Sequence, residues 1–430
     1  MTWDAVVVGG GIAGLVAARE LVHDGLRTLV LEARDTVGGA VAGHTVAGLR
    51  LDAGAESYAT RGGTVAALLD ELGLTDSVRT PEPLGAWVHL PHGDGPLPRT
   101  GLLGIPADPW AARGTLGLVG TARASLDLVL PASSATSLGD LVRRRMGARV
   151  LYRLVRPVVG GVHAADPDDL AVDAVAPGLP DALGRERGSL ARAVRSLRAS
   201  APAGSAVQGV AGGLHVLVDA LVADIEAHGG TVRTGVTVGS LDDEDADRWV
   251  LATPSAVDLL GLAVGRPDPG AQVTLVTLVL DAPALDAAPR GTGVLVAREA
   301  TDVTAKALTH ATAKWGWLAQ AAGPGRHVVR LSYGRAGGAG QEAAPDVDVA
   351  LRDASVLLGT PLSRDQLEGH AIVRWTEALP RPSVAHVRVV AAVRSAVEPL
   401  AGVAVCGAWV AGNGLASVVP DARAAARSLL

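Results

Sequence analysis

The stretch Gly9-Gly10-Gly11-Ile12-Ala13-Gly14 decides the fold of this 430-residue chain. Ala5–Val8 before it is short and apolar, as in a buried strand, and Ile12–His23 after it carries small residues on one side, as in a helix packed on a sheet. Thr28–Glu32 reads as a second strand. Because parallel strands need a helical crossover, this order predicts a right-handed β-α-β unit.

The glycine spacing predicts a dinucleotide site at this turn. Gly9 allows the tight turn, Gly11 lets the backbone approach a pyrophosphate, and Gly14 lets the helix pack closely. The helix N-terminus offers free N–H groups and partial positive charge to the anion. Glu32, about 20 residues later, is placed to bind the ribose hydroxyls. The fingerprint does not separate FAD from NAD, and a turn that serves packing alone is the alternative.

Composition excludes several classes of protein. Hydrophobic residues make up 48% and charged residues 19%, so the chain is globular, and the net charge of −6 argues against a general nucleic-acid surface. The single cysteine, Cys406, excludes a disulfide framework, and the histidines lack metal-site spacing, so we expect no metal. No apolar run reaches the roughly 18 residues of a spanning helix, and no targeting segment precedes the first strand. These features predict a cytoplasmic protein without a transmembrane segment.

The rest of the chain alternates between helices and strands. Residues 111–200 are expected to be mostly helical, with Ser137 capping a helix that runs to Met146, and strands dominate 273–373. Pro420 predicts the first turn of the last helix, or a break in it. The remaining expected elements are helices at Thr64–Leu72, Leu214–His228, Val347–Leu358 and within Leu415–Leu430, and strands at Thr231–Thr234, Val236–Val238, Arg248–Ala252 and Val403–Cys406.

Two stretches beyond the turn carry a family resemblance. Leu31-Glu32-Ala33-Arg34-Asp35-Thr36-Val37-Gly38-Gly39 and Leu51-Asp52-Ala53-Gly54-Ala55-Glu56 resemble the flavin-dependent amine oxidase superfamily, in which they wrap the FAD diphosphate and approach the flavin. The segments Gly212–Leu217, Val250–Pro254 and Cys406–Leu415 resemble the family's return into the FAD domain, its strand end near the cofactor, and its second FAD contact.

The resemblance implies an amine-oxidase-like fold of mixed α/β and α+β class. A discontinuous Rossmann-type FAD-binding domain would comprise residues 1–80, 205–262 and 385–430. A mixed-sheet substrate-binding domain would comprise 81–105 and 263–384, and a helical domain 106–204, with a role in substrate access or membrane contact.

The resemblance also implies the residues that hold FAD, which we expect to be bound without a covalent link. Position 40 is Ala where the family usually has Arg or Lys, so one expected cation is missing, and Arg34 and Arg61 are the candidates to compensate for it in part. The implied cofactor residues are Gly9, Gly11, Ile12, Ala13, Gly14, Glu32, Ala33, Arg34, Gly38, Gly39, Ala53, Gly54, Ala55, Glu56, Val236, Ala252, Thr253, Trp375, Gly407, Gly414 and Leu415.

Segments in the middle of the chain and beyond it resemble one group within this superfamily. Arg156–Leu170, Thr312–Trp315 and Arg374–Pro380 resemble segments of protoporphyrinogen and coproporphyrinogen III oxidases. Gly316 stands where that group has Pro, Pro382 stands where an aromatic residue is common, and the chain has no Phe. The Ala- and Arg-rich composition suggests an actinobacterial source, where the coproporphyrin route to haem is common, and therefore favours coproporphyrinogen III over protoporphyrinogen IX.

The implied reaction removes six electrons from the porphyrinogen, with molecular oxygen as acceptor and hydrogen peroxide as product. No catalytic motif is present, because the flavin carries the chemistry. His163 and His386 are weak catalytic candidates, and Lys314, Arg61, Arg99 and Arg145 are candidates for the substrate's carboxylates. The expected partners are the porphyrinogen, oxygen and a ferrochelatase that receives the product, with room for a peripheral membrane contact.

Three alternatives stay open from the sequence. The first is a protoporphyrinogen IX oxidase. The second is another amine oxidase or desaturase, although Tyr58, Tyr152 and Tyr333 offer little for the aromatic pair that amine oxidation needs. The third is a non-catalytic porphyrin-binding or redesigned member of the fold, which Ala40 and the absence of Phe favour.

Overall fold

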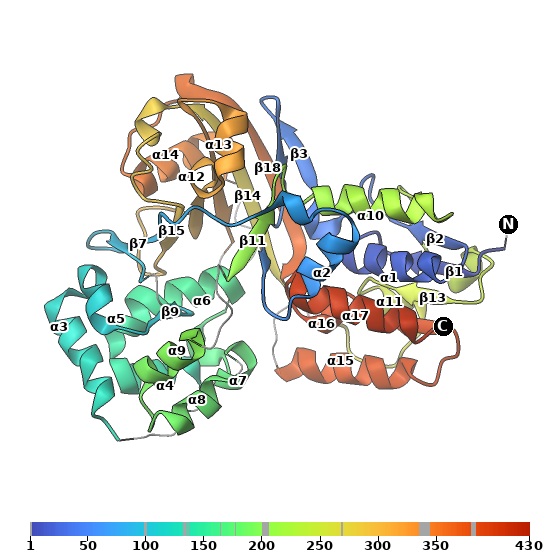
Figure 1. Cartoon of the computed structure of the whole chain (residues 1–430), viewed down its shortest axis with the longest axis horizontal. Coiled ribbons are helices and arrows are strands. Elements are labelled where there is room, and N and C mark those ends of the chain that lie inside the picture. The colour runs from blue at the N-terminus through green and yellow to red at the C-terminus, as the bar shows by residue number, and fades with distance from the viewer. Residues whose placement is uncertain are drawn as a thin grey trace. The chain divides into compact units, whose positions relative to one another are not determined.

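The computed structural model describes residues 2–98, 101–131, 135, 137–163, 165–176, 178–199, 206–267, 270–334, 345–379 and 384–430. The chain forms two compact units (Figure 1). Unit 1 comprises Met1–Pro81, Ser205–Gln272 and Trp375–Leu430, and unit 2 comprises Glu82–Gly204 and Val273–Arg374. The assignment of segments to cofactor, substrate and helical domains stays a prediction.

A five-stranded parallel sheet forms the centre of unit 1. Its order is β12 (Thr231–Arg233), β2 (Thr28–Leu31), β1 (Ala5–Val8), β13 (Trp249–Leu251) and β19 (Val403–Val405). Every pair in it is parallel, so the carboxyl ends of all five strands lie at one edge. The β-α-β unit predicted from the sequence is confirmed, with α1 at Ile12–His23.

The strand expected at Val236–Val238 is wrong. Gly235 has a φ of 72° and turns the chain out of the sheet. Among the described residues, two backbone hydrogen bonds continue beyond β12 along its neighbour, from Gly235 N to Arg34 O and from Val236 N to Glu32 O. Residues 236–238 therefore continue as irregular backbone.

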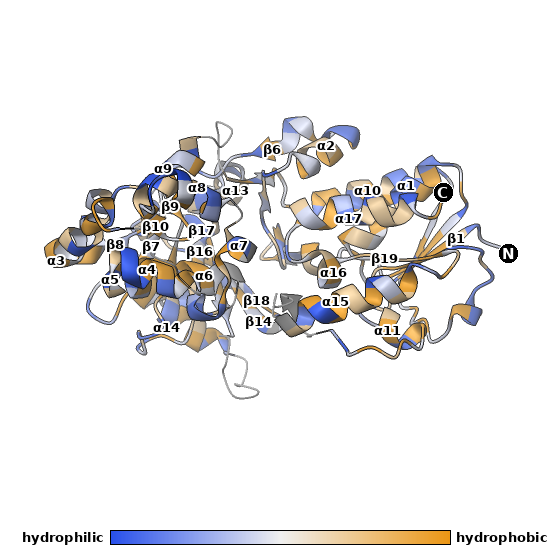
Figure 2. Ribbon diagram, turned by 90° about the horizontal axis from the view of Figure 1, so that it is seen from below, coloured by the Kyte–Doolittle hydropathy of each residue, from blue (hydrophilic) through white to orange (hydrophobic). Residues whose placement is uncertain are grey.

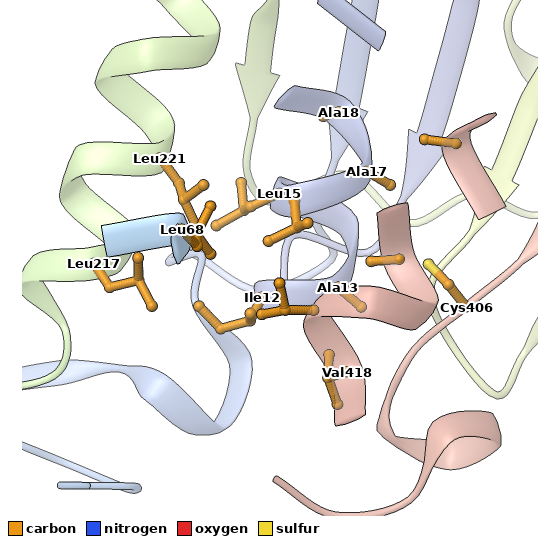
Figure 3. Packing of buried hydrophobic residues seen from close by; sticks show 14 of the residues in the cluster. Ile12, Ala13, Leu15, Ala17, Ala18, Leu68, Leu217, Leu221, Cys406 and Val418 are labelled. Carbon is orange, nitrogen blue, oxygen red and sulfur yellow. The ribbon is translucent and has the colours of Figure 1, made fainter. Parts of the chain in front are cut away.

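Side chains of alternating residues bury the two faces of this sheet. Ala5 and Val7 of β1 join a cluster with α1, α2 (Thr64–Glu71), α10 (Val216–Ala227) and α17 (Leu415–Arg427). Val6 and Val8 join a second cluster with α11 (Ala256–Leu259) and α15 (Val384–Val397). Figure 2 shows these two helix layers on opposite sides of β1 and β19, and Figure 3 shows α1 packed within the first cluster.

Pro420 lies inside α17, beyond its first turn, and the expectation that it marks the first turn is wrong. Proline has no N–H to donate to the carbonyl four residues earlier, which belongs to Ala416. The Thr64 hydroxyl donates to that carbonyl instead, at 3.3 Å. A side chain of a neighbouring helix thus satisfies the group that the proline leaves open.

Two small sheets complete unit 1. The first is an antiparallel hairpin of β3 (Gly43–Val46) and β4 (Leu49–Asp52). The second has the order β5 (Tyr58–Ala59), β11 (Val207–Val210) and β6 (Val78–Arg79). The short helix α16 (Ala408–Ala411) lies between β19 and α17 in the chain.

Unit 2 is built on a seven-stranded mixed sheet. Helix α14 (Val347–Leu358) packs on the sheet through an apolar cluster, and α12 (Ala311–Lys314) and α13 (Gly316–Ala322) follow one of its strands. The strand order is β18 (Leu367–Leu379), β14 (Ala271–Asp281), β17 (Arg326–Tyr333), β16 (Ala307–His310), β15 (Gly293–Val296), β7 (Trp87–His89) and β8 (Gly95–Pro96).

The helical part of unit 2 has a core of its own. Ser137 caps α4 as expected, with its hydroxyl accepting from Asp140 N at 3.1 Å. The hairpin of β9 (Gly101–Leu102) and β10 (Ile105–Pro106) precedes the helices in the chain. The helices are α3 (Arg113–Ser125), α4 (Leu138–Met146), α5 (Ala148–Val150), α6 (Arg156–His163), α7 (Val172–Val175), α8 (Leu179–Arg185) and α9 (Leu190–Ala199). Among all the helices that the structure describes, none is long and apolar enough to cross a bilayer.

Candidate functional site

The glycine turn between β1 and α1 has the geometry that its spacing predicts. A Cβ at Gly14 would lie 1.8 Å from Gly9 O, so only glycine fits there. Gly9 has a φ of 103°, and a Cβ at this residue would lie 3.2 Å from Ala252 O. At Gly11, however, no atom of the described residues lies within 4 Å of the Cβ position. The turn is therefore packed on the protein side and open at Gly11, next to the N–H groups that begin α1.

Glu32 lies directly against this turn. Its carboxylate accepts hydrogen bonds from Gly10 N at 2.7 Å and from Arg34 N at 3.0 Å. A carboxylate has about four lone-pair positions, so capacity for hydroxyl donors remains. Val236 N donates to the main-chain oxygen of Glu32, which places Val236 beside the same residue, and Ala33 is exposed there.

The second glycine pair lies beside the turn. Gly38 N donates to Gly10 O at 2.8 Å, and Gly38 forms an isolated parallel bridge with Gly11. A Cβ at Gly39 would lie 3.4 Å from the Cα of Gly11. The structure thus brings together two glycine segments that the resemblance assigned to one diphosphate.

Residues 53–56 lie next to the segment that carries the second glycine pair. Ala55 N donates to Ala40 O at 2.8 Å, and a Cβ at Gly54 would lie 2.1 Å from that oxygen. The indole N–H of Trp375 donates to Ala53 O at 3.0 Å. The guanidinium of Arg34 lies 5.6 Å from the centre of the Trp375 ring, so a cation lies close to the segment where Ala40 removes one.

One contact in this region was not anticipated from the sequence. The carboxylate of Asp52 accepts from Leu214 N and His215 N at 3.0 Å each, and it contacts His215 Nδ1 at 2.9 Å. Asp52 thereby fastens the segment before α10 to the end of β4. The Leu51–Glu56 and Gly212–Leu217 segments, each noted separately in the sequence, are neighbours through this one side chain.

The remaining segments of the implied cofactor set lie at the carboxyl edge of the five-stranded sheet. Ala252 N donates to Val8 O at 2.8 Å, and a Cβ at Gly407 would lie 3.4 Å from Ala252 O. Thr253 Oγ1 shares a hydrogen bond with Ser255 Oγ at 3.1 Å. Gly414 is the N-cap of α17 with a φ of 103°, and in the part of the chain that the structure describes nothing lies within 4 Å of its Cβ position.

Two helices therefore begin at the same edge of this sheet. Helix α1 follows β1 directly, while α17, with Leu415 as its first residue, follows β19 after the short α16. Ile12 and Ala13 of α1 share an apolar cluster with Leu415 of α17. Both N-termini offer N–H groups without helical acceptors, the arrangement that binds anions and negatively polarised groups.

Cys406 lies behind this edge and is fully buried. Burial raises the pKa of its thiol far above the usual range, with a smaller contribution from the charge of Asp421. A neutral, inaccessible thiol is a poor nucleophile, in keeping with the expectation that FAD is bound without a covalent link.

The candidate cations differ in their surroundings. Arg61, in unit 1, is exposed and donates to Ser417 Oγ at 2.9 Å, next to the first turn of α17. Lys314, in unit 2, lies with its Nζ 5.1 Å from the centre of the Trp315 ring. Arg99 lies outside the described residues.

Arg145 does not fit the role of a substrate ligand. Its side chain is 2% exposed, and its Nε donates to the fully buried Asp127 carboxylate at 2.7 Å. Its other nitrogens donate to the main-chain oxygens of Asp127, Leu130 and Pro131. Asp127 also accepts from Ser189 Oγ at 2.8 Å. The pair holds the helical core of unit 2 together and has no access to a dissolved carboxylate.

The two histidine candidates lie on different helices, His386 on α15 and His163 on α6. His386 is buried on α15, with 7% of its surface exposed. His163 ends α6, and its side chain lies outside the described part of the structure.

Glu56, one of the implied cofactor residues, is half-buried.

Comparisons with known proteins add the family. The model of the family described as flavin containing amine oxidoreductase matches residues 12–259. A protein of Mycobacterium tuberculosis (strain H37Rv) named coproporphyrinogen III oxidase is 30% identical over 451 residues, which cover 99% of this chain and 96% of that protein. A chloroplastic protoporphyrinogen oxidase of Oryza sativa subsp. japonica is 31% identical over 281 residues, covering 59% of this chain and 50% of that protein.

A solved structure also shares the fold. It comes from Exiguobacterium sp. 255-15 and is provisionally named a protoporphyrinogen oxidase. The TM-score is 0.83 at 24% identity, and the match covers 99% of this chain and 98% of the other. The mixed α/β and α+β, amine-oxidase-like architecture is thereby confirmed.

Proposed function

The chain belongs to the family of flavin-containing amine oxidoreductases, and from this premise we propose that it oxidises coproporphyrinogen III to coproporphyrin III with FAD and molecular oxygen. The reaction removes six electrons in three two-electron steps, releases hydrogen peroxide and serves haem biosynthesis. The observation that carries the proposal is the match with a coproporphyrinogen III oxidase across 99% of this chain.

The residues at the carboxyl edge of the unit 1 sheet fit FAD. The open Cβ side of Gly11 leaves room for a diphosphate at the start of α1. Glu32 suits the ribose hydroxyls, and Val236 suits the adenine side. Two-electron acceptance and reoxidation by oxygen are the chemistry that FAD supplies when bound. The residues that would hold it are the implied set from Gly9 to Leu415, with Gly414 and Leu415 presenting the N-terminus of α17 to the flavin end.

Arg34 is the candidate for the cation that Ala40 lacks. It lies 5.6 Å from the Trp375 ring, and Trp375 in turn bonds the 53–56 segment. Its backbone N–H already fixes Glu32, so one short segment would serve both the ribose and the diphosphate. We propose that FAD is held without a covalent link, because the single thiol is buried with a raised pKa.

Binding the substrate's four carboxylates needs cationic side chains and does not need general acids or bases. Arg61 and Lys314 are the described candidates, and Arg99 stays a candidate from the sequence alone. Arg61 suits a carboxylate near the flavin end, because it lies beside the first turn of α17. His163 and His386 stay candidates for taking up protons from the pyrrole nitrogens.

The proposed domain roles follow the segments. Residues 1–80, 205–262 and 385–430 would hold FAD, 81–105 and 263–384 the substrate, and 106–204 would control access to it. We propose a cytoplasmic location with a product hand-over to a ferrochelatase. Exposed apolar residues of the helical part, namely Leu118, Val119, Leu126, Leu128 and Val129, support a peripheral contact with a membrane or partner.

Protoporphyrinogen IX is the second candidate substrate, and the partial match with the chloroplastic protein favours it. Amine oxidation finds less support. Tyr58 and Tyr333 are buried, and Tyr152 lies under the guanidinium of Arg156 at 4.6 Å. None of the three is placed to form an exposed aromatic pair.

The test compares the two porphyrinogens directly. Purified protein is given each substrate under air, and porphyrin fluorescence and hydrogen peroxide are followed together. The proposal expects three peroxide molecules per coproporphyrin and a kcat/KM at least tenfold higher for coproporphyrinogen III. A preference for protoporphyrinogen IX would replace the substrate, and no porphyrin from either would refute the proposed activity.

A further inference from the structure

A cluster of two histidines and one aspartate lies on the surface of unit 1, apart from the proposed FAD residues. His23 is the last residue of α1, and Asp224 and His228 lie one turn apart at the end of α10. One ligand atom from each residue lies within 4.8 Å of the others. The end of α1 and the end of α10 thus bring three metal-binding side chains to one point.

The contacts within the cluster are close. His23 Nε2 lies 2.7 Å from Asp224 Oδ2, and His228 Nδ1 lies 3.6 Å from Asp224 Oδ1. The two imidazole rings are 4.0 Å apart between centres, with their planes at 32°. The three side chains therefore lie close enough together for one small cation to contact all of them.

The ligand atoms are prepared for an ion. His228 Nδ1 lies 2.8 Å from the main-chain oxygen of Asp224. When Nδ1 donates there, Nε2 keeps its lone pair, which is the orientation that a second hydrogen bond gives to metal-binding histidines.

Arg19 is the group that opposes a cation here. Its Nε donates to Asp224 Oδ2 at 2.8 Å, while its NH1 donates to Glu71 at 2.7 Å, a carboxylate outside the cluster that also accepts from Arg423. The other oxygen, Oδ1, is the one available to an ion. The side chains of His23, Asp224 and His228 are 38%, 21% and 42% exposed, so an ion has access from solvent and room for water ligands.

We propose that His23, Asp224 and His228 bind one divalent first-row transition-metal ion, of the zinc, copper and nickel class. Two imidazoles and one carboxylate suit these ions, whereas calcium and magnesium prefer oxygen ligands. The ion would join α10 to the helix that begins at the glycine turn. Because it binds only the folded chain, it would raise the thermal stability of unit 1.

The test uses the full-length protein, with any affinity tag removed and its metals stripped by a chelator. Zinc is titrated in competition with a coloured chelator, and the site predicts one zinc per chain. His23→Ala and His228→Ala each weaken binding at least tenfold, and the double variant abolishes it. His92→Ala and His370→Ala are the matched controls, because both histidines are exposed and lie outside the cluster, and they leave the affinity unchanged.

A copper titration gives a second readout that does not depend on activity. Electron paramagnetic resonance of the copper-loaded protein should show two imidazole nitrogens, reduced to one in either single variant. Unchanged circular dichroism would show that the variants fold. Equal zinc affinity in the double variant and the parent protein would overturn the proposal, and so would the absence of stoichiometric binding.

Discussion

Gly11→Ala separates the cofactor role of the glycine turn from its packing role. Gly11 has a φ of −71° and a ψ of 175°, which alanine adopts freely, and none of the described atoms lies within 4 Å of its Cβ position. The variant should therefore fold. The added methyl group occupies the space that a diphosphate needs to reach the first N–H groups of α1.

The expected loss follows from those hydrogen bonds. One bond to a charged acceptor contributes about 1.5–3 kcal/mol, so losing one weakens FAD binding by about 10- to 150-fold. Gly14→Ala should behave differently, because its Cβ would lie 1.8 Å from Gly9 O. That overlap costs about 1–3 kcal/mol of folding free energy or more and should yield unstable protein.

The assay is reconstitution of the apoprotein with FAD, followed by the quenching of flavin fluorescence. Gly184→Ala in α8 is the matched control, since it too has nothing within 4 Å of the added Cβ and lies in unit 2. It should leave FAD affinity unchanged. A Gly11→Ala protein that folds and binds FAD within twofold of the parent would refute the assignment of the turn to the diphosphate.

Three other changes have expected outcomes. Asp127→Ala leaves the Arg145 guanidinium buried without its carboxylate and should lower the free energy of unfolding by about 3–5 kcal/mol in denaturant titration, and a loss below about 1 kcal/mol would contradict the buried pair. Burial and the neighbouring His327 lower the pKa of His310 from 6.5 to about 4, so the unfolded chain binds the extra proton and stability falls as the pH drops through this window. By about pH 5 the free energy of unfolding should have fallen by about 2 kcal/mol, and this fall should be smaller in His310→Gln. A His310→Gln variant with the same pH profile as the parent would exclude His310 as the cause. Lys314→Met should raise the KM for coproporphyrinogen about tenfold with FAD content unchanged, and Lys314→Arg should restore most of it; an unaltered KM would remove Lys314 from the substrate site.

The local part of the fold could be predicted from the sequence. Strand β1, helix α1 and helix α14 have the predicted bounds, because their apolar spacing and flanking turn residues lie within a few positions. The Gly9–Gly14 contact is also local. Val236–Val238 was wrong because a strand needs a neighbour along its length, and Gly235 turns the chain away.

The contacts that assemble the site could not be predicted in the same way. Asp52 binds His215 across 163 positions, and no spacing rule connects them. From the sequence, Arg145 was a candidate for the substrate's carboxylates, but the structure buries it. Its burial depends on Asp127, which itself accepts from Ser189 and Ala191 more than 60 positions away. Pairs of charged residues far apart in the sequence could therefore not be predicted from local patterns.

Anaerobic mixing of the purified protein with coproporphyrinogen III tests the central claim most directly. The protein should show the visible absorption bands of an oxidised flavin, and the proposed non-covalent link predicts that denaturation releases it intact as FAD. Addition of coproporphyrinogen should bleach those bands, and admission of air should restore them as porphyrin fluorescence rises. Flavin bands that coproporphyrinogen leaves unchanged, or a protein without flavin, would contradict the claim.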